Sequence, residues 1–144
     1  MKPHEFIGKL DHDQIAAAIA EAERTTSGEI RVFIAHQRVT DALAAARMQF
    51  LRLAMTKTRQ RNAVLLFLAP RTRHFAVWGD QGVHEKCGDD FWREIVSAAT
   101  ARLGQGNFSE AVIGAVQRTG EVLARHFPRE PDDRNELPDA VVSD

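Results

Sequence analysis

The sequence predicts an α/β domain in which about four helices cover a small mixed sheet. Segments with helical spacing and segments with strand-like spacing of apolar residues alternate along the chain, which is typical of this fold class. Residues 62–69 form a continuous apolar run, as expected for a central strand that is covered on both faces. With 144 residues, the chain has the size of one domain with a single core.

The first half of the chain predicts a helix, a strand and a second helix. Residues 11–24 carry apolar residues at steps of three and four, and Asp11 or Asp13 is available as the helix cap. Residues 30–35 alternate in the manner of a mostly buried strand, and residues 41–55 return to helical spacing. The apolar positions behind these predictions are Ile15, Ala18, Ile19, Ala22, Ile30, Val32, Ile34, Leu43, Ala46, Phe50, Leu53 and Ala54.

The second half predicts a β-hairpin followed by two long helices. Residues 62–69 and 74–78 are joined by the short turn "PRTR", which favours an antiparallel pair. A third helix starts near Phe91 and ends at the glycines that follow Leu103. A fourth helix covers residues 108–127, where the apolar spacing is again helical and Pro128 stops the pattern.

The domain organisation predicted from composition has three parts. Residues 1–10 form an N-terminal arm, and residues 11–127 form the folded domain. Residues 128–144 are acidic, contain three of the five prolines and have little apolar surface to bury. We therefore expect this tail to be mobile or loosely docked.

Composition excludes several classes of protein. The 19 basic and 20 acidic residues give a formal net charge of −1 without a sustained basic stripe, so nucleic acid is not an expected partner. The single cysteine, Cys87, excludes an internal disulfide framework and a multi-cysteine zinc module. The N-terminus lacks the apolar segment of a secretory signal, and no stretch is apolar enough to span a bilayer. We expect a cytoplasmic protein without membrane insertion.

The predicted topology gathers polar residues at one edge of the sheet. Strands 30–35 and 62–69 should run parallel because a helix joins them, and strand 74–78 should run antiparallel to its predecessor. The starts of the first two strands and the exit of the third then meet, within roughly 10 Å of each other for adjacent strands. This edge would hold Glu29, Arg61, Asn62 and Asp80, and the loop of residues 81–90 would add Glu85, Asp89 and Asp90.

Two interpretations of this acidic edge follow from the residue types. Carboxylate, amide and backbone oxygens are the ligands that Ca²⁺ and Mg²⁺ prefer, and a cation would offset the repulsion between carboxylates. In the other interpretation, Asp89 and Asp90 only cap the third helix, while Glu85 is a solvated surface residue. His84 and Cys87 are three positions apart, but two ligands do not complete a zinc site.

The motifs "SGEIRV", "RNAVLLFLA", "FAVWGDQGV", "FW" and "NF", in this order, resemble the TPM domain family. That family is named for a thylakoid-lumen phosphatase-like protein, a photosystem-associated protein and an auxiliary subunit of a nematode acetylcholine receptor. The resemblance covers roughly residues 10–127, and the compact form of the chain is similar to a bacterial subgroup of the family. It implies a three-layer α/β/α sandwich with three to four strands, divalent cation binding in some members, and acid phosphatase activity in a plant member.

The resemblance also relates individual positions to the family pattern. The asparagine-glycine of the second strand matches Asn62 and Ala63, and Arg61 replaces an acidic residue that often precedes it. An aspartate that follows the glycine-rich turn matches Asp89 or Asp90. A glutamate frequent after this turn falls on His84 or Glu85, depending on a one-residue gap.

The resulting hypothesis is a TPM-type domain that binds Ca²⁺ or Mg²⁺, with weak phosphatase activity on a small phosphate ester. Its metal ligands are Asp80, Asp89 and Asp90, with Asn62 and Glu29 completing or orienting the shell. Arg61 is the candidate phosphate contact. The alternative is a non-enzymatic module that recruits a protein partner through its helical faces or its acidic tail.

Overall fold

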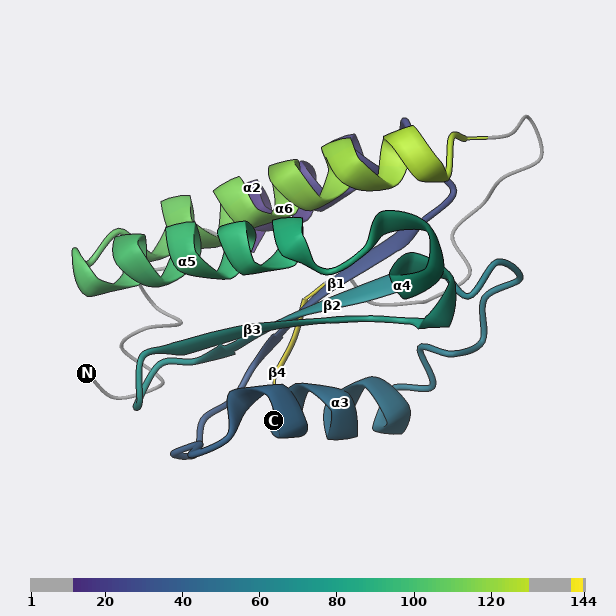
Figure 1. Ribbon diagram of the computed structural model, residues 1–144. Coiled ribbons are helices and arrows are strands. Elements are labelled where there is room, and N and C mark those ends of the chain that lie inside the picture. The colour runs from purple at the N-terminus through teal and green to yellow at the C-terminus, as the bar shows by residue number, and fades with distance from the viewer. Residues whose placement is uncertain (1–11, 130–140, 144) are drawn as a thin grey trace.

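The computed structural model of the protein describes residues 12–129 and 141–143. Its described residues form a three-layer α/β/α sandwich with five helices and a four-stranded sheet, which confirms the predicted fold class (Figure 1). The helices are α2 (His12–Glu23), α3 (Ala42–Arg52), α4 (Gln81–Cys87), α5 (Asp90–Gly104) and α6 (Phe108–His126). The strands are β1 (Glu29–Ile34), β2 (Ala63–Ala69), β3 (His74–Gly79) and β4 (Val141–Ser143).

The sheet is mixed and has the strand order β3-β2-β1-β4. Strand β1 runs parallel to β2 and to β4, and β2 runs antiparallel to β3. The predicted directions of the first three strands are therefore confirmed. The crossover through α3 explains the parallel pair, and the short turn after Ala69 explains the antiparallel pair.

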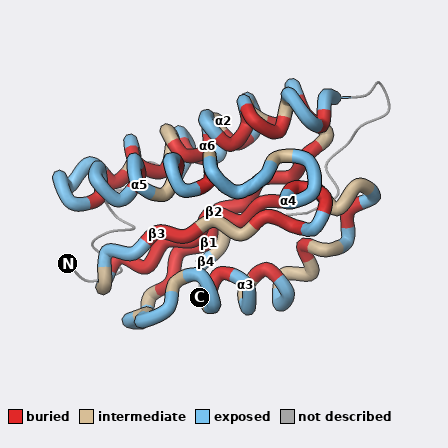
Figure 2. The backbone as a smooth tube through the Cα atoms, viewed as in Figure 1, coloured by how far each residue is buried: buried red, intermediate tan, exposed pale blue. Residues whose placement is uncertain are grey.

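Helices cover the two faces of the sheet unequally. Helices α2, α5 and α6 lie on one face, whereas α3 alone covers the other (Figure 1). Side chains alternate along β1, so that Ile30, Val32 and Ile34 enter the core beneath the three helices while Phe33 enters the core beneath α3. Strand β2 is buried along its whole length, as its continuous apolar run predicted (Figure 2).

Two elements differ from the prediction. Residues 81–90 were expected to be a loop, but Gln81–Cys87 form the short helix α4, which Asp80 caps by accepting a hydrogen bond from the Gln81 backbone nitrogen. No strand was expected after Pro128, yet Val141–Ser143 pair with β1. The predicted arm at residues 1–10, and residues 130–140 of the predicted tail, lie outside the described residues.

Candidate functional site

Three chain segments meet at one end of the sheet, as the topology predicted. Glu29 at the start of β1 lies beside Ala63 at the start of β2, and the Asp80 backbone nitrogen donates to the Ala63 carbonyl oxygen over 2.9 Å. The hydroxyl of Ser27 accepts hydrogen bonds from the side-chain amides of Gln60 at 3.1 Å and Asn62 at 3.2 Å. We refer to this region, residues 27–29, 58–62 and 80, as the sheet end.

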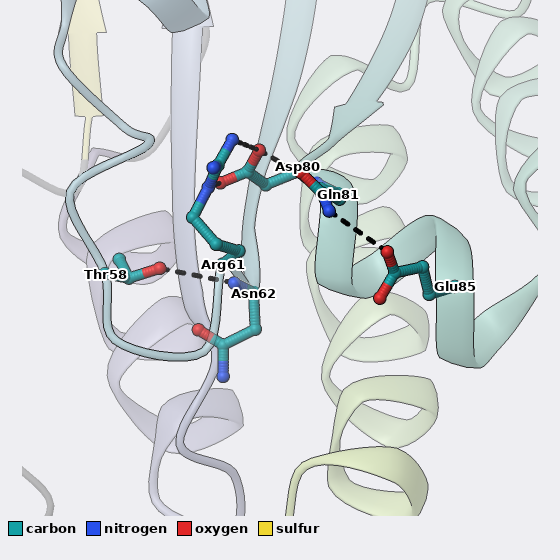
Figure 3. Close-up of polar contacts among 6 residues, drawn as sticks. All are labelled: Thr58, Arg61, Asn62, Asp80, Gln81 and Glu85. Carbon is teal, nitrogen blue, oxygen red and sulfur yellow. Dashed lines mark hydrogen bonds and ion pairs between the residues drawn. The ribbon is translucent and has the colours of Figure 1, made fainter.

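The guanidinium group of Arg61 holds the carboxylate of Asp80 with two hydrogen bonds (Figure 3). Nε of Arg61 lies 2.6 Å from Oδ2 of Asp80, and Nη2 lies 2.7 Å from Oδ1. Asp80 is buried, whereas the Arg61 side chain is 43% exposed. Hydrogen bonding to Asp80, and then its charge, raises the pKa of Arg61 above the ordinary value. Arg61, the candidate phosphate contact, therefore already binds the carboxylate of Asp80.

Asn62 is buried, but its side chain points away from Asp80 (Figure 3). The Asn62 backbone nitrogen donates to the hydroxyl of Thr58 at 3.2 Å, and its side-chain nitrogen donates to Ser27. Its side-chain oxygen Oδ1 is buried and has no hydrogen-bond partner among the described residues. Buried amide oxygens are nearly always satisfied in folded proteins, so this oxygen is an open acceptor at the sheet end.

Glu29 is buried and forms a pair with Glu23, the last residue of α2. One carboxylate oxygen of Glu23 accepts a hydrogen bond from the Ile30 backbone nitrogen at 2.8 Å. The pKa of Glu23 is raised from 4.5 to about 7, mainly by burial and in addition by the charge and the hydrogen bond of Glu29, whereas the hydrogen bond from Ile30 lowers it. Glu23 therefore carries a proton at mildly acidic pH.

Asp89 and Asp90 lie at the junction of α4 and α5 and are both exposed. A carboxylate oxygen of Asp89 lies 3.1 Å from Nδ1 of His84, and a carboxylate oxygen of Asp90 lies 3.7 Å from a guanidinium nitrogen of Arg93. The seven residues of α4 separate Asp80 from Asp89 by a helix length of about 10 Å. Within the described residues, no three side chains of His, Cys, Asp or Glu gather in a geometry suited to a metal ion.

The structure therefore brings together only part of the predicted ligand set. Glu29, Asn62 and Asp80 share the sheet end, whereas Asp89 and Asp90 form a separate exposed pair. Asp89 occupies the N-cap position of α5, but its side chain makes no capping hydrogen bond. Cation binding by the five residues stays a prediction.

Cys87, at the end of α4, is poorly suited to nucleophilic catalysis. Burial raises the pKa of its thiol from 9.0 to about 11, and nearby Lys86 lowers it only in part. The thiol is therefore almost entirely protonated at neutral pH.

A cavity of about 580 Å³ lies along β3, and no pattern in the sequence indicated it. It is lined mainly by apolar residues of α3, β3 and α5, among them Leu43, Phe75, Val77, Trp78, Trp92 and Val96. His84, Asp89 and Arg93 add polar groups to its wall. The spacing of apolar residues predicted α3, β3 and α5 but did not indicate the cavity between them.

The family model of the TPM domain matches residues 2–122 of the chain. The chain belongs to the TPM domain family. The match extends over the sheet end, both faces of the sheet and the junction of α4 with α5, so the expectation from the sequence motifs is confirmed. No protein of curated function is significantly similar to the chain.

Solved structures share the fold of this TPM domain. The NMR structure of the BA42 protein from the psychrophilic bacterium Bizionia argentinensis is 33% identical, with a TM-score of 0.84, and the similarity covers 94% of this chain and 96% of that one. The N-terminal domain of a protein from P. gingivalis is 15% identical, with a TM-score of 0.64 over 85% and 83% of the two chains. The N-terminal domain of the cg2496 protein from Corynebacterium glutamicum is 18% identical, with a TM-score of 0.61 over 81% and 75%.

None of the described helices combines the length and the hydrophobicity that a transmembrane segment requires.

Proposed function

We propose that this TPM domain binds a divalent cation, Ca²⁺ or Mg²⁺, at the sheet end, with the side-chain oxygen of Asn62 as one ligand. The supporting observation is that Asn62 Oδ1 is buried without a hydrogen-bond partner among the described residues. A buried polar atom left in this state costs about 1–3 kcal/mol, which a cation or an ordered water would remove. The hydrogen bond from the Asn62 amide nitrogen to Ser27 holds the oxygen in a fixed orientation.

The sheet end provides oxygen ligands that fit a hard cation, and its two carboxylates belong to Glu29 and to Asp80, from which the Asn62 side chain points away (Figure 3). Both oxygens of Asp80 accept hydrogen bonds from Arg61, so a cation would compete with the guanidinium group for this carboxylate. Glu29 is paired with Glu23, whose raised pKa makes cation binding stronger as the pH rises. We assign Asp89 and Asp90 a weaker, separate role because α4 lies between them and Asp80.

Calorimetric titration with Ca²⁺ and with Mg²⁺ tests this proposal. We expect a heat of binding, a raised melting temperature, and at least a tenfold loss of affinity in Asn62→Ala. Asn107→Ala is the matched control, because Asn107 precedes α6 and its side chain makes no capping hydrogen bond. The double variant Asp89→Asn/Asp90→Asn separates the two acidic groups and should retain most of the affinity. Absence of heat and of thermal stabilisation with either ion, or equal losses in both asparagine variants, would contradict the proposal.

We further propose that the domain has weak phosphomonoesterase activity. Arg61 is partly exposed, and a guanidinium group that already binds a carboxylate keeps further N–H donors for a phosphate oxygen. A bound cation would supply charge stabilisation to the phosphoryl group. Turnover of a generic phosphate ester should depend on the cation, stop with chelator and fall in Arg61→Gln. Turnover that survives chelation would assign the activity to a site without metal.

A second candidate function is recognition of an extended peptide, and the edge of β3 favours it. Among the described strands, β3 pairs only with β2. Because Asp80 donates to Ala63, the alternate residues Phe75, Val77 and Gly79 direct their backbone groups away from β2. The apolar cavity lies beside these groups, which is the arrangement for adding a peptide strand.

Selection from a random peptide library tests this second candidate. Enriched peptides should alternate apolar and polar residues, and Val77→Pro should abolish their binding because it removes an outward N–H. This N–H does not pair with β2, so the melting temperature of the variant should change little. Peptides that still bind the variant would show that the β3 edge is not the site.

A further inference from the structure

The basic residues of this protein are concentrated in the part of the chain that contains α3. Residues 36–73 hold eight of the 19 lysines and arginines and one acidic residue, Asp41, for a net charge of +7. The rest of the chain therefore carries −8, although the whole protein carries −1. Asp41 is engaged as the N-cap of α3, and of the eight cations Arg61 is bound to Asp80. The other seven are exposed.

These seven cations follow the course of α3. Two lie on the helix, three lie near its start and two follow its end. On the helix they are Arg47 and Arg52, near the start they are Arg38, Arg71 and Arg73, and after the end they are Lys57 and Arg59. The turn that carries Arg73 lies next to the chain before α3, because His74 Nδ1 contacts the Val39 carbonyl oxygen at 3.2 Å. The cations thus lie on a single helix and in the segments next to its two ends.

The outer surface of α3 also carries large apolar side chains. Leu43, Met48 and Leu51 are 52%, 61% and 54% exposed, and they are the large hydrophobic residues with the greatest exposure in the described part of the chain. Leu43, Arg47 and Leu51 follow one another at steps of four, which places apolar and basic side chains in one row. Ala46 and Phe50 face the core instead, so α3 is apolar on its inner side and mixed apolar and basic on its outer side.

Helix α3 forms one layer of the sandwich by itself, so its outer surface projects from the molecule (Figures 1 and 2). A projecting helix with exposed leucine and methionine side chains among arginines matches the interface of an anionic bilayer, where apolar groups enter between headgroups and cations meet phosphates. A nucleic acid would use the cations but leave the apolar side chains exposed to water. A folded acidic protein would need a concave surface to cover the helix.

We infer that the outer face of α3 is a peripheral docking surface for an anionic lipid bilayer. The contact is formed by Leu43, Met48 and Leu51 together with Arg47 and Arg52, and the flanking cations add long-range attraction. This inference is independent of the cation site, since the sheet end contributes only Arg59 and Arg61 to the basic segment, neither is part of the contact, and Arg61 is held by Asp80.

Co-sedimentation of the full chain with lipid vesicles tests the inference, in the presence of chelator so that a bound cation plays no part. The protein should sediment with vesicles of phosphatidylglycerol and phosphatidylcholine, should release as salt rises, and should stay in solution with phosphatidylcholine alone. Each cation near an anionic surface contributes about fivefold to partitioning, so Arg47→Glu/Arg52→Glu should reduce it by about 20-fold or more. Met48→Ser/Leu51→Ser should reduce it by roughly tenfold.

The matched control is Arg118→Glu/Arg125→Glu on α6, which changes net charge by the same amount at one mid-helix and one last-turn position. It should retain most of the binding. Absence of sedimentation with anionic vesicles, or equal loss in the control, would overturn the inference. So would a dimer in light scattering that Met48→Ser/Leu51→Ser dissociates, or binding of duplex DNA in place of vesicles, because either result assigns the surface to another occupant. If the serine variant does not fold, the two charge-reversal variants decide the matter.

Discussion

Arg61 and Asp80 are 19 positions apart, and their bidentate contact ties the start of β2 to the end of β3. The same Asp80 carboxylate accepts a hydrogen bond from the Gln81 backbone nitrogen at 2.8 Å and so begins α4. One buried side chain therefore joins two strands and a helix at the sheet end. Arg61 itself has a φ of 51°, a left-handed conformation that non-glycine residues seldom adopt. The contact of Arg61 with Asp80 compensates for the free-energy cost of this backbone conformation.

Two substitutions of Asp80 separate its capping role from its charge. Asp80→Ala loses both, and the lost cap alone should reduce the free energy of unfolding by about 0.5–2 kcal/mol. Asp80→Asn keeps a good N-cap but leaves Arg61 without its carboxylate, so it should be the milder change. Urea unfolding of the three proteins measures this difference. Equal losses in both variants would mean that the ion pair, and not the cap, dominates.

Most of the fold could be predicted from the spacing of apolar residues. Strand β2 is a continuous apolar run, and α6 carries apolar residues along one side, so local pattern and final structure agree. Strand β4 could not be predicted, because Val141 and Val142 provide only two apolar positions and the pairing with β1 creates the strand. Helix α4 was missed because its cap and its packing of Val83, not its apolar spacing, define it.

The candidate site was predicted in position but not in the direction of its side chains. Topology correctly placed Glu29, Asn62 and Asp80 at one end of the sheet. It did not show that the side chains of Asn62 and Asp80 point in different directions (Figure 3). Asp80 lies opposite Ala63, the residue that follows Asn62, and successive residues of an extended chain face opposite sides. The distance of Asp89 from Asp80 depended on α4, which was expected to be a loop. The net charge of −1 likewise concealed the basic surface around α3.

The buried pair of Glu23 and Glu29 predicts a pH-dependent stability. The pKa of Glu23 rises from 4.5 in the unfolded chain to about 7 in the folded protein, so folding favours the protonated acid. The contribution of Glu23 to the free energy of unfolding is therefore complete below pH 4.5 and is lost as the pH rises to about 7. The loss amounts to at most about 3 kcal/mol.

Glu23→Gln should remove this dependence. The variant should match the natural protein near pH 4 and exceed its stability above pH 7, because a neutral amide needs no proton to stay buried. Urea unfolding across this pH range provides the measurement. Glu21→Gln is the control, since Glu21 pairs with Arg24 on the surface and its replacement should change stability by less than about 0.5 kcal/mol. A stability difference between Glu23→Gln and the natural protein that does not vary with pH would disprove the prediction.

Cys87 should react slowly with thiol reagents. A thiol with a pKa of about 11 has about 100-fold less thiolate at pH 8 than one with the ordinary value of 9.0. Labelling of the folded protein by a chromogenic disulfide should be about 100-fold slower than labelling in urea, with the release of thiolate followed by absorbance. Comparable rates would instead indicate an activated thiol and would reopen a nucleophilic role.

Gly82 should be essential for the sheet end, whereas Gly104 should be replaceable. A Cβ atom at Gly82 would clash with the Gln60 carbonyl oxygen and would lie 2.8 Å from that of Arg61, and these are backbone atoms that can yield only if the segment moves. Gly82→Ala should therefore cost about 1–3 kcal/mol and loosen the contact between Arg61 and Asp80. Gly104 ends α5 with open space around its Cα, so Gly104→Ala should stabilise the protein by about 0.5–1 kcal/mol. Thermal and urea unfolding compare the two variants, and a neutral Gly82→Ala would show that residues 58–62 adjust freely and do not form a rigid wall of the site.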